Sequence, residues 1–115
     1  MYYDLNKKDK KIARLLIDKA LDAQYKAALE EAQELISSWQ KEELNNRDAY
    51  LKLYKILDRH DNSIARRYNG LGGSRYLMTV ACVLFDGLIT NEDIKDFSDE
   101  PKEIINRWIM VQNME

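Results

Sequence analysis

The sequence predicts an all-α protein, a bundle of four to five helices with a long N-terminal helix and a buried central third helix. Apolar residues recur at steps of three and four, and no segment shows the alternation that is typical of a strand. The few glycines and the single proline stand near the ends of the periodic segments. At 115 residues the chain is long enough for one core and short for two. We therefore expect a single helical domain over residues 1–115.

The longest predicted helix runs from Asn6 to Glu43, because no glycine or proline interrupts this segment. Such a helix is about 57 Å long, which is more than the later, shorter helices can easily cover. Its apolar residues keep the 3–4 spacing of a coiled-coil seam, so we expect a homodimer through this helix. In the alternative, the short C-terminal helices fold back and bury Trp39 within one chain. The predicted seam comprises Leu21, Tyr25, Ala28, Ala32, Leu35 and Trp39.

The next two helices are marked by the residues that begin and end them. Asn45, followed three residues later by Asp48, has the pattern of a capping box, and Gly70 stands where a left-handed cap would end the second helix. Ser74 is then expected to cap a third helix that reaches residue 89. Apolar residues surround the axis of this third helix, which predicts that it is buried on most sides.

Two further helices complete the predicted bundle. Thr90, with Asp93 three residues later, is expected to cap a short fourth helix over residues 91–97. A fifth helix is expected to start after Ser98, with Pro101 in its first turn. The residues predicted for its buried face are Ile104, Ile105, Trp108 and Ile109.

The segment RRYNGLGGSRY, residues 66–76, is a candidate anion site. Free N–H groups at a helix N-terminus beside arginines are able to hold a phosphate or a carboxylate. Nucleotide-binding loops follow a strand and carry a lysine or a further spaced glycine, and this segment has neither. We therefore favour a structural turn between two helices and keep the anion site as the alternative. Its residues are Arg66, Arg67, Gly72, Gly73, Ser74 and Arg75.

No residue pattern predicts catalysis or a metal site. Aligning Gly87 with the invariant glycine of an EF-hand loop places Cys82 and Leu84 where calcium needs oxygen ligands, which excludes calcium. His60 is the only histidine, and its acidic neighbours in the sequence do not share its helix face. We therefore expect no enzyme activity, no cofactor and no metal.

A cluster of basic residues opens the first helix, although positive charge opposes the helix dipole at this end. The cluster suggests a surface for an acidic protein or a phosphate, and its members are Lys7, Lys8, Lys10, Lys11 and Arg14. The C-terminal segment also has the outline of a helix-turn-helix, with Lys102, Asn106 and Arg107 facing a groove. Residues 86–103 nevertheless hold seven acids and two lysines, which would repel nucleic acid.

Charge and composition narrow the functional class. The net charge of −2 gives no general attraction to nucleic acid or to an anionic membrane. The lone Cys82 and the polar N-terminal segment are typical of a cytoplasmic protein, and no apolar run is long enough to span a bilayer. We therefore expect a cytoplasmic, non-enzymatic regulator or adaptor that binds another protein or itself. A nucleic-acid-binding protein is the alternative, and the sequence does not identify the partner.

Overall fold

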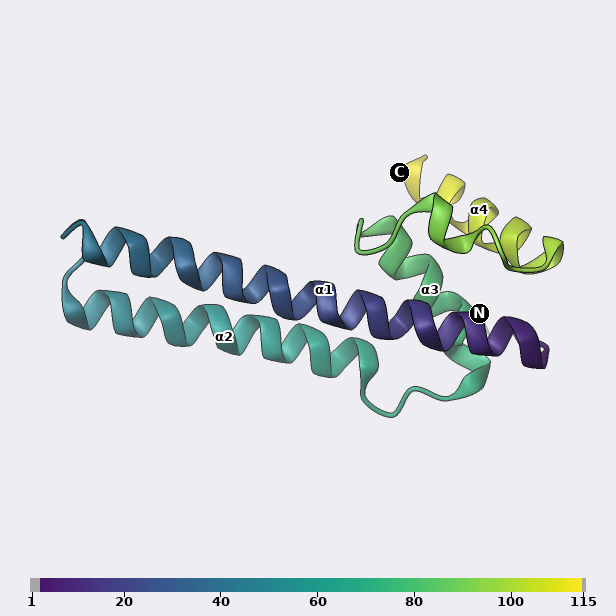
Figure 1. Ribbon diagram of the computed structural model, residues 1–115, viewed down its shortest axis with the longest axis horizontal. Helices are drawn as coiled ribbons and strands as arrows, with labels where there is room; N and C mark the ends of the chain where they lie inside the picture. Colours follow the sequence, from purple (N-terminus) through teal and green to yellow (C-terminus); the bar gives the residue numbers. More distant parts are fainter. Residues whose placement is uncertain (1–2, 115) are drawn as a thin grey trace. The chain divides into compact units, whose positions relative to one another are not determined.

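The computed structural model describes residues 3–114, and within them every regular element is helical (Figure 1). No strand occurs in this part of the chain. The predicted all-α bundle is therefore confirmed, with four α-helices and two short 3₁₀ turns. In order, the elements are α1 (Lys7–Gln40), α2 (Asn46–Tyr68), η1 (Gly73–Arg75), α3 (Tyr76–Phe85), η2 (Asn91–Ile94) and α4 (Asp99–Asn113).

The chain divides into two compact units. The core unit combines the residues up to Leu21 with those from Gly70 onward, and the hairpin unit is the segment from Asp22 to Asn69. Helix α1 contributes its first half to the core unit and its second half to the hairpin unit. The expectation of a single domain stays a prediction.

Helix α3 is the centre of the core unit. Leu77, Val80, Ala81 and Val83 have no exposed surface, which confirms the buried third helix of the sequence prediction. Helix α4 packs against α3 and contributes Ile105, which is also fully buried. The remaining buried apolar residues of this unit are Leu5, Ala13, Leu16, Ile17, Ala20, Leu84, Ile89, Ile94, Phe97 and Pro101.

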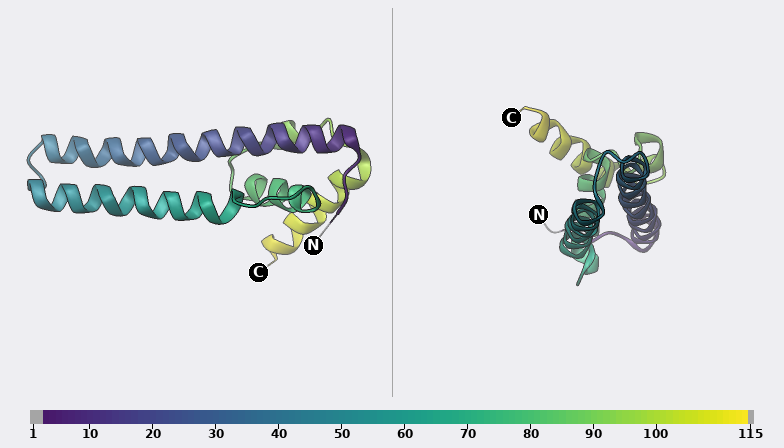
Figure 2. Two further views of the ribbon diagram at one scale, coloured as in Figure 1. Left: turned by 90° about the horizontal axis from the view of Figure 1, so that it is seen from below. Right: turned by 90° about the vertical axis from the view of Figure 1, so that its left-hand side faces the viewer.

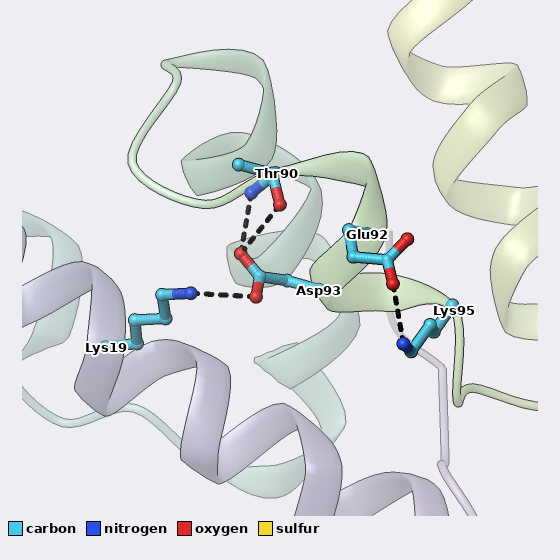
Figure 3. A network of polar contacts seen from close by, with 5 residues as sticks. All are labelled: Lys19, Thr90, Glu92, Asp93 and Lys95. Atoms are coloured by element: carbon cyan, nitrogen blue, oxygen red, sulfur yellow. Dashed lines mark hydrogen bonds and ion pairs between the residues drawn. The ribbon is translucent and has the colours of Figure 1, made fainter.

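The turn between α3 and α4 is held by a polar network that starts at a predicted cap. One carboxylate oxygen of Asp93 accepts hydrogen bonds from the backbone N–H and the hydroxyl of Thr90, at 2.8 and 3.1 Å (Figure 3). Its other oxygen lies 2.8 Å from Lys19 Nζ of α1. Lys95 and Glu92 form a separate surface ion pair in the same view. The cap predicted at Thr90 is confirmed, and it ties η2 to α1.

The hairpin unit consists of the second half of α1 together with the whole of α2. The two helices run antiparallel and side by side in Figure 1 and in the left view of Figure 2. Asn45 begins α2 as predicted, because its side chain accepts a hydrogen bond from Asp48 N at 2.7 Å. Gly70 follows the end of α2 with a φ of 68°, a left-handed conformation that glycine adopts without steric cost. The sequence located both ends of α2 correctly.

Two predicted boundaries of the third helix are wrong. Ser74 lies inside η1, and the residue that precedes α3 is Arg75, which makes no capping hydrogen bond with its side chain. At the other end, α3 stops at Phe85 because Gly87 takes a φ of 78°. The N–H groups of Gly87 and Leu88 then satisfy the last carbonyls of the helix.

Two other predicted elements are shorter than expected. The first helix ends at Gln40, before Glu42, which has a φ of 63° and turns the chain toward α2. The predicted fourth helix is the single 3₁₀ turn Asn91–Ile94. The fifth predicted helix is α4, which begins after Ser98 with Pro101 in its first turn, as expected.

Candidate interaction surface

The hairpin unit contains very little buried surface. Within residues 22–69, the buried residues are Gln24, Ala28 and Ala32, and none of them belongs to α2. Burying one methylene stabilises a fold by about 0.8 kcal/mol, whereas ordering the backbone of one residue costs about 1–2 kcal/mol. The hairpin therefore has few fully buried side chains to offset the cost of ordering its backbone.

Seven exposed apolar side chains of the hairpin form one surface, which we call the apolar face. Within each helix they recur at steps of three, four and seven residues, so they share one side of that helix. Their exposed fractions range from 41% at Ile36 to 71% at Tyr50. The apolar face comprises Tyr25, Leu29, Ile36 and Trp39 of α1 and Tyr50, Tyr54 and Leu57 of α2.

Two grooves between α1 and α2 bring these side chains together. The tip groove, of about 290 Å³, lies near the connection between the helices, and Ile36, Trp39 and Tyr50 line it. The central groove, of about 700 Å³, lies farther along the hairpin. Tyr25, Leu29, Tyr54 and Leu57 line this second groove. Each groove thus receives apolar residues from both helices.

A charged cluster also joins the two helices of the hairpin. The carboxylate of Glu31 on α1 pairs with the guanidinium of Arg59 on α2, and its other oxygen lies 3.1 Å from His60 Nε2. The hydrogen bond to His60, together with that to Arg59, holds the pKa of Glu31 below its usual 4.5. One carboxylate therefore fixes the spacing and the register of α1 and α2 at this point.

A second polar contact joins the helices nearer the open end of the hairpin. The amide oxygen of Gln24, whose residue is only 8% exposed, accepts hydrogen bonds from Tyr68 OH at 2.6 Å and from Arg67 Nη1 at 3.2 Å. A buried amide oxygen without partners would destabilise the fold, so these two donors from α2 account for its burial. Gln24 and Glu31 together set the pairing of the helices.

The tip of the hairpin is held by the indole of Trp39. Its Nε1 donates a hydrogen bond to Asn46 Oδ1 at 2.7 Å, across the connection between α1 and α2. The residue is nevertheless 42% exposed and lines the tip groove. The alternative in which the C-terminal helices cover Trp39 stays a prediction.

The predicted dimer seam divides into two parts. Ala28 lies between Gln24 and Glu31 on the stripe of α1 that faces α2, and both alanines of the seam are 8% exposed. Leu21 and Leu35 are half-buried. The small residues expected to admit a second chain therefore lie against α2 of the same chain. Tyr25 and Trp39, in contrast, remain on the apolar face.

The predicted basic cluster is partly engaged within the core unit. Arg14 lies over the ring of Tyr76 at 5.7 Å and donates to its hydroxyl at 3.4 Å. The side chain of Lys10 passes so close to Gly73 that a Cβ there would lie 3.1 Å from Lys10 Nζ. The other three lysines, Lys7, Lys8 and Lys11, are exposed. Together with Arg14, which is also exposed, these three lysines remain open to a partner.

The residues of the candidate anion site belong to different units. Arg66 and Arg67 lie in the hairpin unit, where Arg67 donates to Gln24. The glycines, Ser74 and Arg75 lie in the core unit. The space where a Cβ of Gly72 would lie is open, whereas the side chain of Lys10 fills the corresponding space at Gly73. The anion site stays a prediction, and its two glycines do not form a shared, empty cradle.

Three polar residues that organise the structure were missed from the sequence. Besides Gln24 and Glu31, Asp9 is only 1% exposed, and its carboxylate accepts a hydrogen bond from Ser98 N at 3.0 Å. The side-chain oxygen of Asn6 accepts a hydrogen bond from Asp9 N at 2.8 Å. This is the capping pattern that the sequence showed at Asn45, so the cap at Asn6 could have been predicted in the same way. Asp9, Gln24 and Glu31 contact residues that are distant in the sequence, so no pattern of neighbouring residues predicts these contacts.

Comparison with known proteins adds no assignment. The chain matches no protein-family model, no curated protein and no solved structure. Across residues 3–114, no three His, Cys, Asp or Glu side chains gather as a metal site would require. No helix in the same part of the chain combines the length and the apolar character needed to cross a membrane. The apolar face is therefore interpreted from its own residues.

Proposed function

We propose that the protein is a non-enzymatic interaction module and that the apolar face binds another protein surface. One observation carries this proposal. Helix α2 is 23 residues long and strongly amphipathic, yet none of its residues is buried. An amphipathic helix normally directs its apolar side at a core, so an uncovered apolar side indicates a binding surface.

The composition of the apolar face supports the same proposal. Four of its seven residues are tyrosine or tryptophan, which are enriched at the centres of protein interfaces because a large rigid ring buries area at a small loss of conformational entropy. The contacts of Gln24 and Glu31 hold the two helices in register, so a partner would meet a preformed surface. Polar side chains such as Asp58 and Asp61 border the central groove, as expected for the rim of an interface.

Nucleic-acid binding, through the basic cluster or a C-terminal helix-turn-helix, remains the second candidate, and it depends mostly on the basic cluster. The exposed Lys7, Lys8 and Lys11 support it. Lys10 and Arg14 support it less, because their side chains pack against Gly73 and Tyr76 within the core unit. Three lysines on an otherwise acidic chain provide few phosphate contacts, so we favour the protein-binding role.

Site-specific photo-crosslinking in the cell tests the proposal. A benzophenone amino acid replaces Tyr50 or Tyr54 on the apolar face, and the matched control carries it at Lys52, which is exposed on α2 and lines a different pocket with Ile56 and Arg59. We expect crosslinked protein bands from the two tyrosine positions and none from Lys52. Equal crosslinking at all three positions, or none at either tyrosine, would refute the assignment of this face.

A further inference from the structure

The apolar residues of α1 form a pattern that reads almost the same in both directions. Tyr25, Leu29, Ile36 and Trp39 are separated by steps of four, seven and three. A second α1 laid antiparallel on the first would place Leu29 opposite Ile36 and Tyr25 opposite Trp39. Each apolar side chain of one copy would then meet an apolar side chain of the other.

Helix α2 shows the same property. Reversal about a point beside Tyr54 places Tyr50 opposite Leu57 and places Tyr54 next to its own copy. Moving the point of reversal by half a residue, to Tyr54 itself, places Arg47 opposite Asp61, and both of these charged residues are exposed. The apolar positions and the charges at the rim are therefore self-complementary in antiparallel registers that differ by only one residue.

The two patterns share one centre along the hairpin. The tip groove contains Ile36 and Trp39 of α1 with Tyr50 of α2, and the central groove contains Tyr25, Leu29 and Leu57. Each groove thus holds one half of each pattern. A single two-fold axis between the grooves would exchange the tip groove of one copy with the central groove of the other, which is the requirement for a closed symmetric contact.

The area available agrees with a dimer interface. An aromatic side chain offers about 150–250 Å², and the four aromatic residues of the apolar face are between 42% and 71% exposed. With Leu29, Ile36 and Leu57 added, the face offers an area of the same order as the roughly 800 Å² per partner that a standard interface buries.

We propose that the occupant of the apolar face is a second copy of this chain, docked with its hairpin antiparallel so that two hairpins form a four-helix bundle. This inference rests on the proposed function of the apolar face and names its partner. Antiparallel packing of four amphipathic helices at shallow angles is a common and stable arrangement. Residues such as Leu29 and Tyr54 would become the core of that bundle.

The first test uses the purified full chain. Sedimentation equilibrium at micromolar concentration is expected to give the mass of two chains. Mild oxidation of a Tyr54→Cys variant is expected to give a covalent dimer, because the axis passes beside Tyr54. A mixture of Leu29→Cys and Ile36→Cys chains should form the mixed disulfide faster than either chain forms its own. The Lys52→Cys variant and the parent, which contains Cys82 alone, are the controls and should remain uncrosslinked.

A charge exchange tests the register without touching the apolar residues. Arg47→Glu should weaken the dimer about fivefold, the effect expected from two symmetry-related exposed pairs. Adding Asp61→Arg should restore the affinity, because the pair is then reversed. Both positions are exposed, so circular dichroism should show the helix content of the parent in each variant. A dimer that fails to respond to either change would overturn the proposed register.

The outcomes separate this inference from the proposed function. A monomer at micromolar concentration, together with a crosslink from Tyr54 to a different protein in the cell, refutes the second copy and leaves the apolar face as a binding surface. A monomer without any crosslink from Tyr50 or Tyr54 refutes both. A dimer that crosslinks through Lys52→Cys and not through Tyr54→Cys refutes the apolar face as the contact.

Discussion

The core unit and the hairpin unit share helix α1 but bury it to very different extents. In the first half of the helix, Ala13, Leu16, Ile17 and Ala20 are all buried. In the second half, the only buried apolar residues are alanines, while Leu29 is 67% exposed. The same helical spacing of apolar residues thus gives a closed core in one unit and an open surface in the other. We conclude that the core unit is stabilised by burial, whereas the hairpin unit leaves apolar side chains exposed.

A pair of isoleucine substitutions should give the largest contrast between the units. Ile105→Ala in α4 removes a fully buried side chain and should lower the free energy of unfolding by about 2–5 kcal/mol. Ile36→Ala on the apolar face, where the residue is 41% exposed, should cost less than about 1 kcal/mol in dilute solution. Urea unfolding followed by circular dichroism measures both values.

Protein concentration sharpens this comparison. If the apolar face binds a second copy, the loss of free energy of unfolding caused by Ile36→Ala should grow with protein concentration. The reason is that dimer formation stabilises the parent more than the variant, which associates more weakly. The cost of Ile105→Ala should not change with dilution. Equal costs for the two variants in dilute solution would show that the hairpin is not the open region of the molecule.

The end of the hairpin should be sensitive to the loss of one glycine. Gly70→Ala should destabilise the fold by about 1 kcal/mol, because alanine is strained at the φ of 68° that follows α2. Gly72→Ala is the matched control, since Gly72 has an ordinary φ and no heavy atom within 4 Å of its Cβ position. We expect the control to be neutral or slightly stabilising. A thermal melt that ranks the two variants in the opposite order contradicts the left-handed cap.

Local sequence signals were sufficient to predict most helix ends. Asn45 with Asp48, Thr90 with Asp93, and Gly70 act within a few residues, so their patterns can be recognised without the fold. Ser74 resembled a cap equally well. The chain instead makes a 3₁₀ turn at this position. The backbone carbonyl of Ser74 accepts a hydrogen bond from Tyr3 N, a contact that no local pattern predicts.

The partner of the apolar stripe on α1 could not be predicted in the same way. Periodicity identified a stripe through Ala28 and Leu35, but it cannot tell whether another segment of the chain or a second chain covers that stripe. The side of α1 that faces α2 carries Gln24 and Glu31, and these polar residues hid that side from an analysis of apolar spacing. Tertiary contacts with α2, rather than the spacing, decide which residues remain exposed.

Acid should weaken the hairpin through one carboxylate. Hydrogen bonds from His60 and Arg59 keep the pKa of Glu31 below 4.5 in the folded chain. A carboxylate whose pKa is lowered by folding stabilises the fold fully when the pH is above its pKa in the unfolded chain. This stabilisation is lost as the pH falls through its pKa in the folded chain. Glu31→Gln should therefore lose less stability than the parent between pH 7 and about pH 3. Melting temperatures across this range provide the measurement.

The core unit contains a comparable carboxylate, which provides the matched variant. Lys19, followed by the backbone N–H of Thr90, lowers the pKa of Asp93 below its usual 3.8. Asp93→Asn should also flatten the pH dependence, and its effect should begin at lower pH than that of Glu31→Gln. If Glu31→Gln follows the parent at every pH, the cluster with Arg59 and His60 does not stabilise the hairpin.

The smallest effect on stability is expected from the exposed lysines of the core unit. Replacing Lys7, Lys8 and Lys11 with glutamine should leave the melting temperature nearly unchanged, because exposed charges contribute little to stability. Lys10 is kept, since its side chain lies against Gly73. The triple variant should also sediment as the parent does, because the apolar face lies in the other unit. Salt-dependent binding of DNA or RNA by the parent, lost in this variant while its sedimentation is unchanged, would assign a second binding activity to the core unit. The absence of nucleic-acid binding by either chain would refute the nucleic-acid alternative.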